Sequence, residues 1–188
     1  MSRIRLLFAM VMMASSLLVL GGRGVEAQRP TEIVVPTATA EGCDQVPAYL
    51  EARTKIMNEF LVDLEAVFPQ VATPIMEHGD QLFDAIVVMT PEQAVGLAKA
   101  YDTVADKIEK LETPPVATFY NDLQVELYRL SADVFEEAGK TDLSTAGEKF
   151  NDQLVAIGEA VDAAGDAATG VCPAFADVVT LDKTQASL

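Results

Sequence analysis

The apolar residues of this chain recur every three or four positions over most of its length, and this spacing constrains the fold more than any other feature. Between Gln45 and Phe68 they fall on one face of a helix, and Pro69 ends the pattern. Four later segments show the same spacing: residues 74–89, 90–111, 113–138 and 144–164. The run AIVVM within the first of these could also be a buried strand, but no partner strand is evident elsewhere. The sequence therefore predicts an all-α fold.

Residues typical of helix ends mark several of the boundaries. Thr90 and Gln93 have the spacing of a capping box. Thr113 is predicted to cap the next helix, because two prolines follow it and stop the preceding one. Gly139 and Gly165 are predicted to end the last two helices, since glycine accepts the backbone conformation that often follows a helix.

The first 27 residues have the three-part plan of a secretory signal peptide. Two arginines precede a 15-residue apolar run, residues 6–20, and small residues at Val25 and Ala27 precede the expected cleavage point. The run is shorter than the roughly 20 apolar residues that a membrane-spanning helix needs. We therefore predict cleavage after Ala27, export from the cytoplasm and no stable membrane span afterwards. An uncleaved N-terminal anchor remains the alternative.

The expected mature chain is strongly acidic. Cleavage would leave 188 − 27 = 161 residues, enough for one domain with its own core. It would remove three of the 13 basic residues and one of the 29 acidic residues, which leaves 10 against 28 and a net charge of −18. Such a surface repels phosphate backbones and anionic lipids, so nucleic acid is not an expected partner. The charge is typical of a solvated surface, and an acidic face that recruits cations or a basic partner is the alternative.

The two cysteines, Cys43 and Cys172, bracket the helical segments. An exported chain enters an oxidising compartment, where a single structural disulfide is the simplest interpretation of two cysteines. Their separation is far from the C-x-x-C spacing of a redox pair, and one histidine is too few for a zinc site. Free or intermolecular thiols remain the alternative. The predicted domain spans residues 43–172, after a linker over residues 28–42 rich in threonine, proline and alanine, and before a tail over residues 173–188.

The predicted disulfide also constrains the topology. Helices in an up-down bundle alternate direction, so the two cysteines meet only after an even number of crossings. Five full crossings would place them at opposite ends. We therefore expect an up-down helical bundle of four long helices, with the shorter helix 74–89 across one end or kinked, and with the ends of the bundle joined by the disulfide.

The chain lacks the residue patterns of familiar enzymes and cofactor sites. His78 is the only histidine, which excludes paired Glu-x-x-His motifs, H-E-x-x-H zinc sites and three-histidine sites. The expected mature chain has no phosphate-binding loop, dinucleotide fingerprint or G-x-S-x-G elbow, and no calcium loop appears. We therefore predict no catalytic residues, no cofactor and no specific metal site.

Some acidic and aromatic groups are weaker candidates for binding. Three sets of carboxylates each share a predicted helix face: Glu77/Asp80/Asp84, Asp102/Asp106/Glu109 and Glu159/Asp162/Asp166. His78 beside Glu77 and Asp80 is the best candidate for a metal, although an ordinary surface histidine is the simpler interpretation. Tyr101, Phe119 and Tyr120 fall on inward stripes and are expected in the core first and in a ligand pocket second.

These observations favour a non-enzymatic protein that acts outside the cytoplasm, in the periplasm or at the cell exterior. The first hypothesis is an exported helical bundle that binds a protein partner or a small apolar ligand. The second is a divalent-cation-binding protein that uses its acidic helix faces. An enzyme is the third, and it would require a buried carboxylate pair in a cleft.

Overall fold

The computed structural model of the protein describes residues 33–185. The predicted signal peptide and the first part of the predicted linker lie outside these residues. The described part contains six α-helices and no strand, which confirms the all-α prediction. The α-helices in chain order are α2 (Val46–Val67), α3 (Gly79–Val87), α4 (Pro91–Glu109), α5 (Thr118–Ala138), α6 (Leu143–Val171) and α7 (Ala176–Gln185). Short 3-10 turns precede α2, α3, α5 and α7: η2 (Cys43–Gln45), η3 (Ile75–Glu77), η4 (Pro115–Ala117) and η5 (Pro173–Phe175).

Side-chain caps explain where two of the helices begin. The backbone N–H of Gln93 donates to the Thr90 hydroxyl and the backbone N–H of Thr90 donates to the Gln93 side chain, so the predicted capping box of α4 is confirmed. The Asp142 carboxylate accepts from the backbone N–H of Thr145 at the start of α6. The predicted cap at Thr113 is wrong, because its hydroxyl bonds the Leu111 carbonyl and α5 begins five residues later, after the turn η4.

The C-terminal part of the chain differs most from the sequence-based expectation. Helix α6 does not end at Gly165 but continues to Val171. A Cβ at Gly165 would lie 3.1 Å from Val179 and 3.3 Å from the Tyr120 ring, so this glycine allows close packing rather than ending the helix. Residues 173–185, predicted to be part of a tail, instead form η5 and α7. They do so because Phe175 and Val178 are fully buried.

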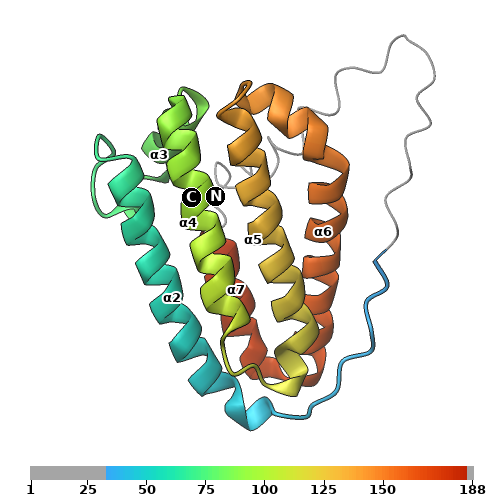
Figure 1. Ribbon diagram of the computed structural model, residues 1–188. Helices are drawn as coiled ribbons and strands as arrows, with labels where there is room; N and C mark the ends of the chain where they lie inside the picture. Colours follow the sequence, from blue (N-terminus) through green and yellow to red (C-terminus); the bar gives the residue numbers. More distant parts are fainter. Residues whose placement is uncertain (1–32, 186–188) are drawn as a thin grey trace, which may run out of the picture.

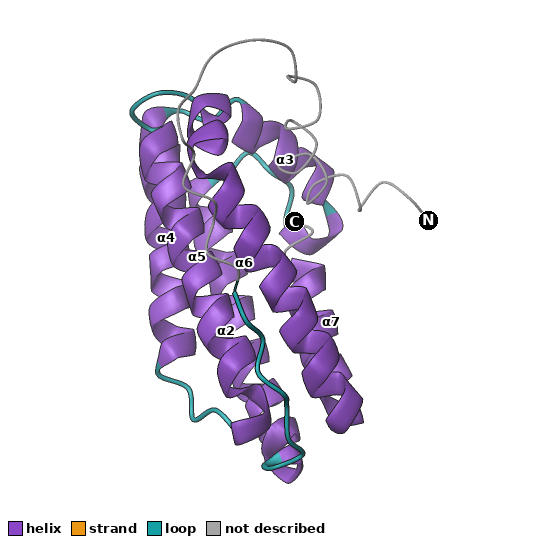
Figure 2. Cartoon of the chain, turned by 90° about the vertical axis from the view of Figure 1, so that its right-hand side faces the viewer, coloured by secondary structure: helices purple, strands orange, loops and turns teal. Residues whose placement is uncertain are grey.

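The four longest helices lie side by side in the order α2, α4, α5, α6 (Figure 1). Helix α7 packs behind this row of four helices (Figures 1 and 2). It contacts α2 and α6, which are the first and last helices of the row. The short helix α3 lies at the end of the molecule where α2 stops and α4 starts. No described helix is both long and apolar enough to cross a membrane.

The interior contains two large apolar clusters. One gathers side chains of α2, α3, α4 and α5, among them Phe60, Leu97 and Tyr128. The other joins the start of α2 to α5, α6, η5 and α7, and residues from the segment before η2 pack against it. Cys43 and Cys172 lie at disulfide distance at this second cluster, with their Cα atoms 5.7 Å apart. The pairing therefore brings the start of α2 next to the end of α6.

Candidate functional site

A group of buried polar side chains lies between α2, α5 and α7, and we call it the Arg53 cluster. Its members are Tyr49, Arg53, Tyr120, Asn121, Gln124 and Asp182. Arg53 is fully buried and Asp182 is 3% exposed. Charged residues are almost never buried this deeply unless they are paired, so the contacts of these two residues decide what the cluster does.

The ion pair at the centre of the cluster uses one nitrogen of the guanidinium group. Arg53 Nε donates to both carboxylate oxygens of Asp182, at 2.8 and 3.1 Å. Arg53 Nη1 donates to the Tyr49 hydroxyl at 3.0 Å and to Asn121 Oδ1 at 3.3 Å. Arg53 Nη2 is buried with no hydrogen-bond partner among the described residues. The cluster thus leaves one strong donor unused.

Hydroxyl groups complete the surroundings of the carboxylate. The Tyr120 hydroxyl donates to Asp182 Oδ2 at 2.8 Å and accepts from Gln124 Nε2 at 3.0 Å. The Tyr49 hydroxyl donates to Asn121 Oδ1 at 2.8 Å. Asp182 is therefore held by a cation and by one hydroxyl donor, both from helices that precede it by more than 60 residues in the chain.

Helical spacing places these groups together. Tyr49 and Arg53 are four residues apart on α2, and Tyr120 and Gln124 are four residues apart on α5, so each pair shares a helix face. Helix α7 supplies Asp182, which contacts Arg53 of α2 and Tyr120 of α5. The sequence patterns did not single out Arg53, and residue 182 was predicted to lie in a tail, so this site was not predicted. One signal was available, since Arg53 lies on the apolar face between Tyr49 and Met57.

The electrostatics keep the arginine charged and the tyrosines neutral. Burial disfavours the charge of Arg53, but the Asp182 carboxylate and the neighbouring Tyr49 and Tyr128 together favour it, and the pKa of Arg53 is raised above its usual value. Burial raises the pKa of Tyr49 to about 12, although the nearby Arg53 charge acts in the opposite direction. Burial and the Asp182 charge also raise the pKa of Tyr120. At neutral pH these tyrosines donate hydrogen bonds and do not transfer protons, so the cluster is suited to holding a carboxylate.

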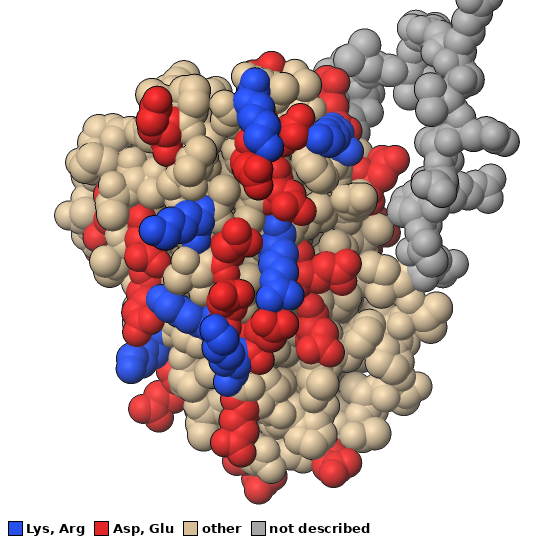
Figure 3. All heavy atoms as spheres, viewed as in Figure 1, with Lys and Arg blue, Asp and Glu red and all other residues tan. Residues whose placement is uncertain are grey.

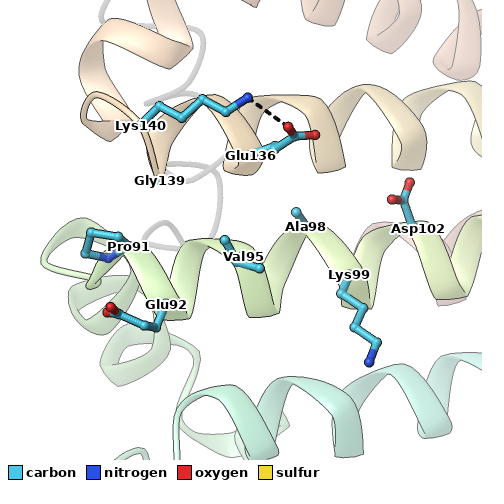
Figure 4. Close-up of a pocket in the computed structure, with 9 residues that line it drawn as sticks. All are labelled: Pro91, Glu92, Val95, Ala98, Lys99, Asp102, Glu136, Gly139 and Lys140. Atoms are coloured by element: carbon cyan, nitrogen blue, oxygen red, sulfur yellow. Dashed lines mark hydrogen bonds and ion pairs between the residues drawn. The ribbon is translucent and has the colours of Figure 1, made fainter.

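A second candidate lies on the surface, in a groove between the start of α4 and the end of α5 (Figure 4). We call it the α4/α5 groove. Its volume is about 550 Å³. Its lining residues are Pro91, Glu92, Val95, Ala98, Lys99, Asp102, Glu136, Gly139 and Lys140. Seven of these nine are exposed, so the groove is an open depression of the surface rather than an enclosed cavity.

The floor of the groove is apolar and its rim is charged. Ala98 and Asp102 point from α4 toward α5, whereas Lys99 points away from α5 (Figure 4). Lys140 forms an ion pair with Glu136 at 2.8 Å along the other side. Val95, which also lines the groove, is 59% exposed. Ala98 in the floor of the groove and the exposed Val95 next to it together form an apolar surface that an apolar side chain of another molecule can contact.

A smaller cavity lies under the segment that precedes η2. It is about 110 Å³ in volume, and residues 35–39 cover it. Phe119, Tyr120 and Ala164 form part of its wall. This volume is well below the roughly 300–1,000 Å³ of sites that enclose a drug-sized molecule, so the cavity does not accommodate such a ligand.

The residues that the sequence singled out for metal binding are not brought together. Glu77 and Asp80 are exposed and His78 is half-buried. Within residues 33–185, no group of three or more His, Cys, Asp or Glu side chains is placed to hold a metal ion. Members of the other two carboxylate sets engage basic residues: Asp106 and Glu109 pair with Arg129 of α5, and Asp162 pairs with Lys183 of α7.

The aromatic candidates take the places expected of core residues. Tyr120 is buried, and Phe119 packs against the same apolar cluster. Tyr101 packs against the cluster that contains Phe60, and the two ring centroids are 5.1 Å apart. The prediction that these residues belong to the core first is confirmed, and Tyr120 additionally takes part in the Arg53 cluster.

On one face of the molecule, charged side chains gather over two helices (Figure 3). On the face shown in Figure 3, acidic and basic side chains gather along the middle, over α4 and α5. Arg129 of α5 contacts Glu109 at 2.8 Å and Asp106 at 3.5 Å, both on α4, and Lys107 of α4 contacts Glu59 of α2 at 3.1 Å. Exposed pairs of this kind contribute about 0–1 kcal/mol each to stability. The charges therefore shape what can approach this face more than they hold the helices together.

Comparisons with known protein families, with curated proteins and with solved structures found no match to this chain.

Proposed function

We propose that this protein is an exported, non-enzymatic helical protein that binds a segment of a partner protein in the α4/α5 groove. The observation that carries the proposal is the groove itself, about 550 Å³ in volume, with the exposed Val95 at its side. Exposed apolar surface rimmed by polar residues is typical of protein interaction sites. The partner segment we expect carries an apolar side chain flanked by Lys or Arg.

The charge of the chain supports a basic partner. The full sequence has a net charge of −16 at neutral pH, and the mature chain that we expect has −18. On the rim of the groove, Lys140 pairs with Glu136, Glu92 and Asp102 are exposed, and the exposed Lys99 points away from α5 (Figure 4). Complementary charges steer a partner to such a surface and suppress wrong partners.

A protein segment suits the groove better than the small apolar ligand that we also considered. A site for a small apolar ligand usually encloses most of the ligand surface. The α4/α5 groove is lined mainly by exposed residues, and the covered cavity beneath residues 35–39 measures only about 110 Å³. A partner side chain needs no enclosure, because the rest of its own protein excludes water around it.

The remaining parts of the proposal concern location and architecture. Cysteines at disulfide distance are compatible with a compartment outside the cytoplasm, where disulfides persist. We propose that Cys43 and Cys172 form a disulfide that joins the ends of an up-down bundle of four long helices. A non-enzymatic role is supported by the Arg53 cluster, whose charged residues are bonded to one another and sealed from solvent. The cation-binding alternative has less support, since Asp106 and Glu109 of α4 engage Arg129 and Glu136 of α5 engages Lys140.

Two matched valines test the proposal. Val95 lies in the groove and Val62 lies outside it on α2, and the two are 59% and 61% exposed. Material exported by the native host is passed over the immobilised mature protein, over Val95→Asn and over Val62→Asn. These changes remove the apolar side chain without adding a charge, and we expect a basic partner that the wild type and Val62→Asn retain and that Val95→Asn retains at least tenfold less.

Both substitutions are expected to leave Tm within about 2 °C of the wild-type value, because exposed positions change stability little. Equal retention by the two variants would show that the groove is not the binding surface. Native mass spectrometry of the protein isolated from its host provides a second readout. A stoichiometric metal ion or apolar small molecule in that experiment would favour the other candidate functions instead.

A further inference from the structure

Helix α7 is attached to the rest of the protein in a different way from the other helices. The paired cysteines enclose residues 43–172, so α7 lies outside the loop that they close. It has ten residues, several of them β-branched. Isolated helices of this length are marginal in water. Helix α7 therefore depends on its docking to α2 and α6 for its structure, and no covalent link beyond the chain itself fixes it there.

The docked surface of the C-terminal segment consists of a few apolar side chains and one carboxylate. Phe175 and Val178 are fully buried, and Asp182 is the one buried charged residue of α7. Asp177 and Thr180 on the same helix are exposed. Asp182 is therefore inserted into a polar recess whose other polar side chains all come from α2 and α5.

The recess offers a carboxylate more donors than Asp182 uses. Arg53 Nε contacts both oxygens of Asp182, at 2.8 and 3.1 Å, and the Tyr120 hydroxyl contacts one of them at 2.8 Å. Arg53 Nη2 is buried and has no partner within the described chain. Guanidinium groups commonly receive a carboxylate with two parallel bonds from two nitrogens. A carboxylate that is not attached to the α7 backbone can accept from both Arg53 Nε and Arg53 Nη2. The position of Asp182 is fixed by α7, and Nε is the only guanidinium nitrogen from which its carboxylate accepts.

We propose that Arg53 and Tyr120 form a carboxylate-binding site that Asp182 occupies in cis, and that a carboxylate not tethered to the chain binds there when the Asp182 carboxylate is absent. The ligand class is a small carboxylate anion. The site shares no residue with the α4/α5 groove, so its test is independent of the test of the proposed function.

Chemical rescue tests the site directly. Asp182→Ala removes a group of the size of formate and leaves the rest of α7 in place. We expect this variant to lose roughly 6–20 °C in Tm, because it leaves the Arg53 charge buried and unpaired. Sodium formate is expected to restore part of the loss in a saturable manner, while sodium chloride at the same ionic strength is not. If Asp182→Ala is unfolded in chloride, formate is expected to restore its helical circular dichroism signal.

Two further variants show whether the effect belongs to this site. Asp177→Ala removes an exposed carboxylate from the same helix and is expected to show no formate-specific change. The double variant Arg53→Met/Asp182→Ala keeps the space but lacks the cation, and it is expected to show none either. Equal effects of formate and chloride on Asp182→Ala would overturn the proposal, as would an undiminished formate effect in the double variant.

Discussion

Two neighbouring parts of the interior are built from the same pair of helices but follow different physical rules. Helices α2 and α5 supply Phe60, Tyr128 and Phe135 to an aromatic cluster that Tyr101 of α4 completes. Phe60 lies seven residues beyond Arg53 on α2, so the aromatic cluster and the Arg53 cluster are two turns apart. The Arg53 cluster is completed by α7 rather than by α4.

The contrast teaches how each part is stabilised. In the aromatic cluster the rings meet edge-on or tilted at centroid distances of 5.1–6.2 Å, and stability there scales with buried area and shape. Replacing one of these rings by a smaller side chain therefore lowers stability in proportion to the buried apolar area that is removed. In the Arg53 cluster a lost partner leaves a buried charge, and that penalty does not scale with size. The Arg53 cluster is expected to tolerate change much less than its neighbour.

The largest expected effect is a loss of stability at alkaline pH that involves both clusters. Burial raises the pKa of Tyr101 and the pKa of Tyr49 to about 12, and it also raises the pKa of Tyr120 and of Tyr128. The folded protein then keeps phenol protons that the unfolded chain loses near pH 10. The contribution to stability is complete below pH 10 and is lost as the pH rises from 10 through 12. Each tyrosine costs up to about 1.4 kcal/mol per pH unit in that window, or roughly 5–10 kcal/mol for the four together at pH 12.

Urea unfolding at pH 8, 10, 11 and 12, together with absorbance at 295 nm, measures this loss. Tyr101→Phe sharpens the comparison, because it removes one titrating group from the aromatic cluster without breaking a hydrogen bond of the Arg53 cluster. Its contribution is smaller than that of a fully buried group, since Tyr101 is only half-buried. Phenolate formation at pH 10 without loss of stability would contradict the expectation.

The next effect is that of removing one partner of the buried ion pair. Arg53→Met is expected to lower the free energy of unfolding by about 3–5 kcal/mol, because Asp182 then remains buried without its cation. Arg53→Met/Asp182→Leu is expected to recover most of this loss, since apolar side chains of similar size remove both charges. Urea unfolding followed by circular dichroism gives both values. A double variant no more stable than Arg53→Met would show that the cost comes from packing rather than from charge.

The smallest effect is expected in the aromatic cluster. Phe60 is 4% exposed and contacts the Tyr101 and Tyr128 rings. Phe60→Leu keeps an apolar side chain and is expected to cost about 1–2 kcal/mol, well below the cost of complete truncation to alanine. Urea unfolding followed by circular dichroism measures this cost as well. If Phe60→Leu cost as much as Arg53→Met, the proposed distinction between the two clusters would be lost.

The sequence determined the features that depend on neighbours along the chain. Apolar spacing located α2 and the aromatic stripe residue Tyr101, because a helix repeats every 3.6 residues whatever surrounds it. The capping box at Thr90 was likewise predictable, since both of its partners lie within four residues. The pairing of Cys43 and Cys172 was predicted from an expected exported chain with only two cysteines, and the two lie at disulfide distance.

Only the tertiary structure decided the two candidate sites. The ion pair joins Arg53 to Asp182 across 129 residues, and no local pattern distinguishes such a carboxylate from an exposed one. The continuation of α6 past Gly165 depends on the ring of Tyr120 and on Val179 lying against it. The α4/α5 groove arises where Gly139 approaches the start of α4. In each case the deciding energy comes from burial and contacts between distant segments, which the spacing of residues along the chain does not contain.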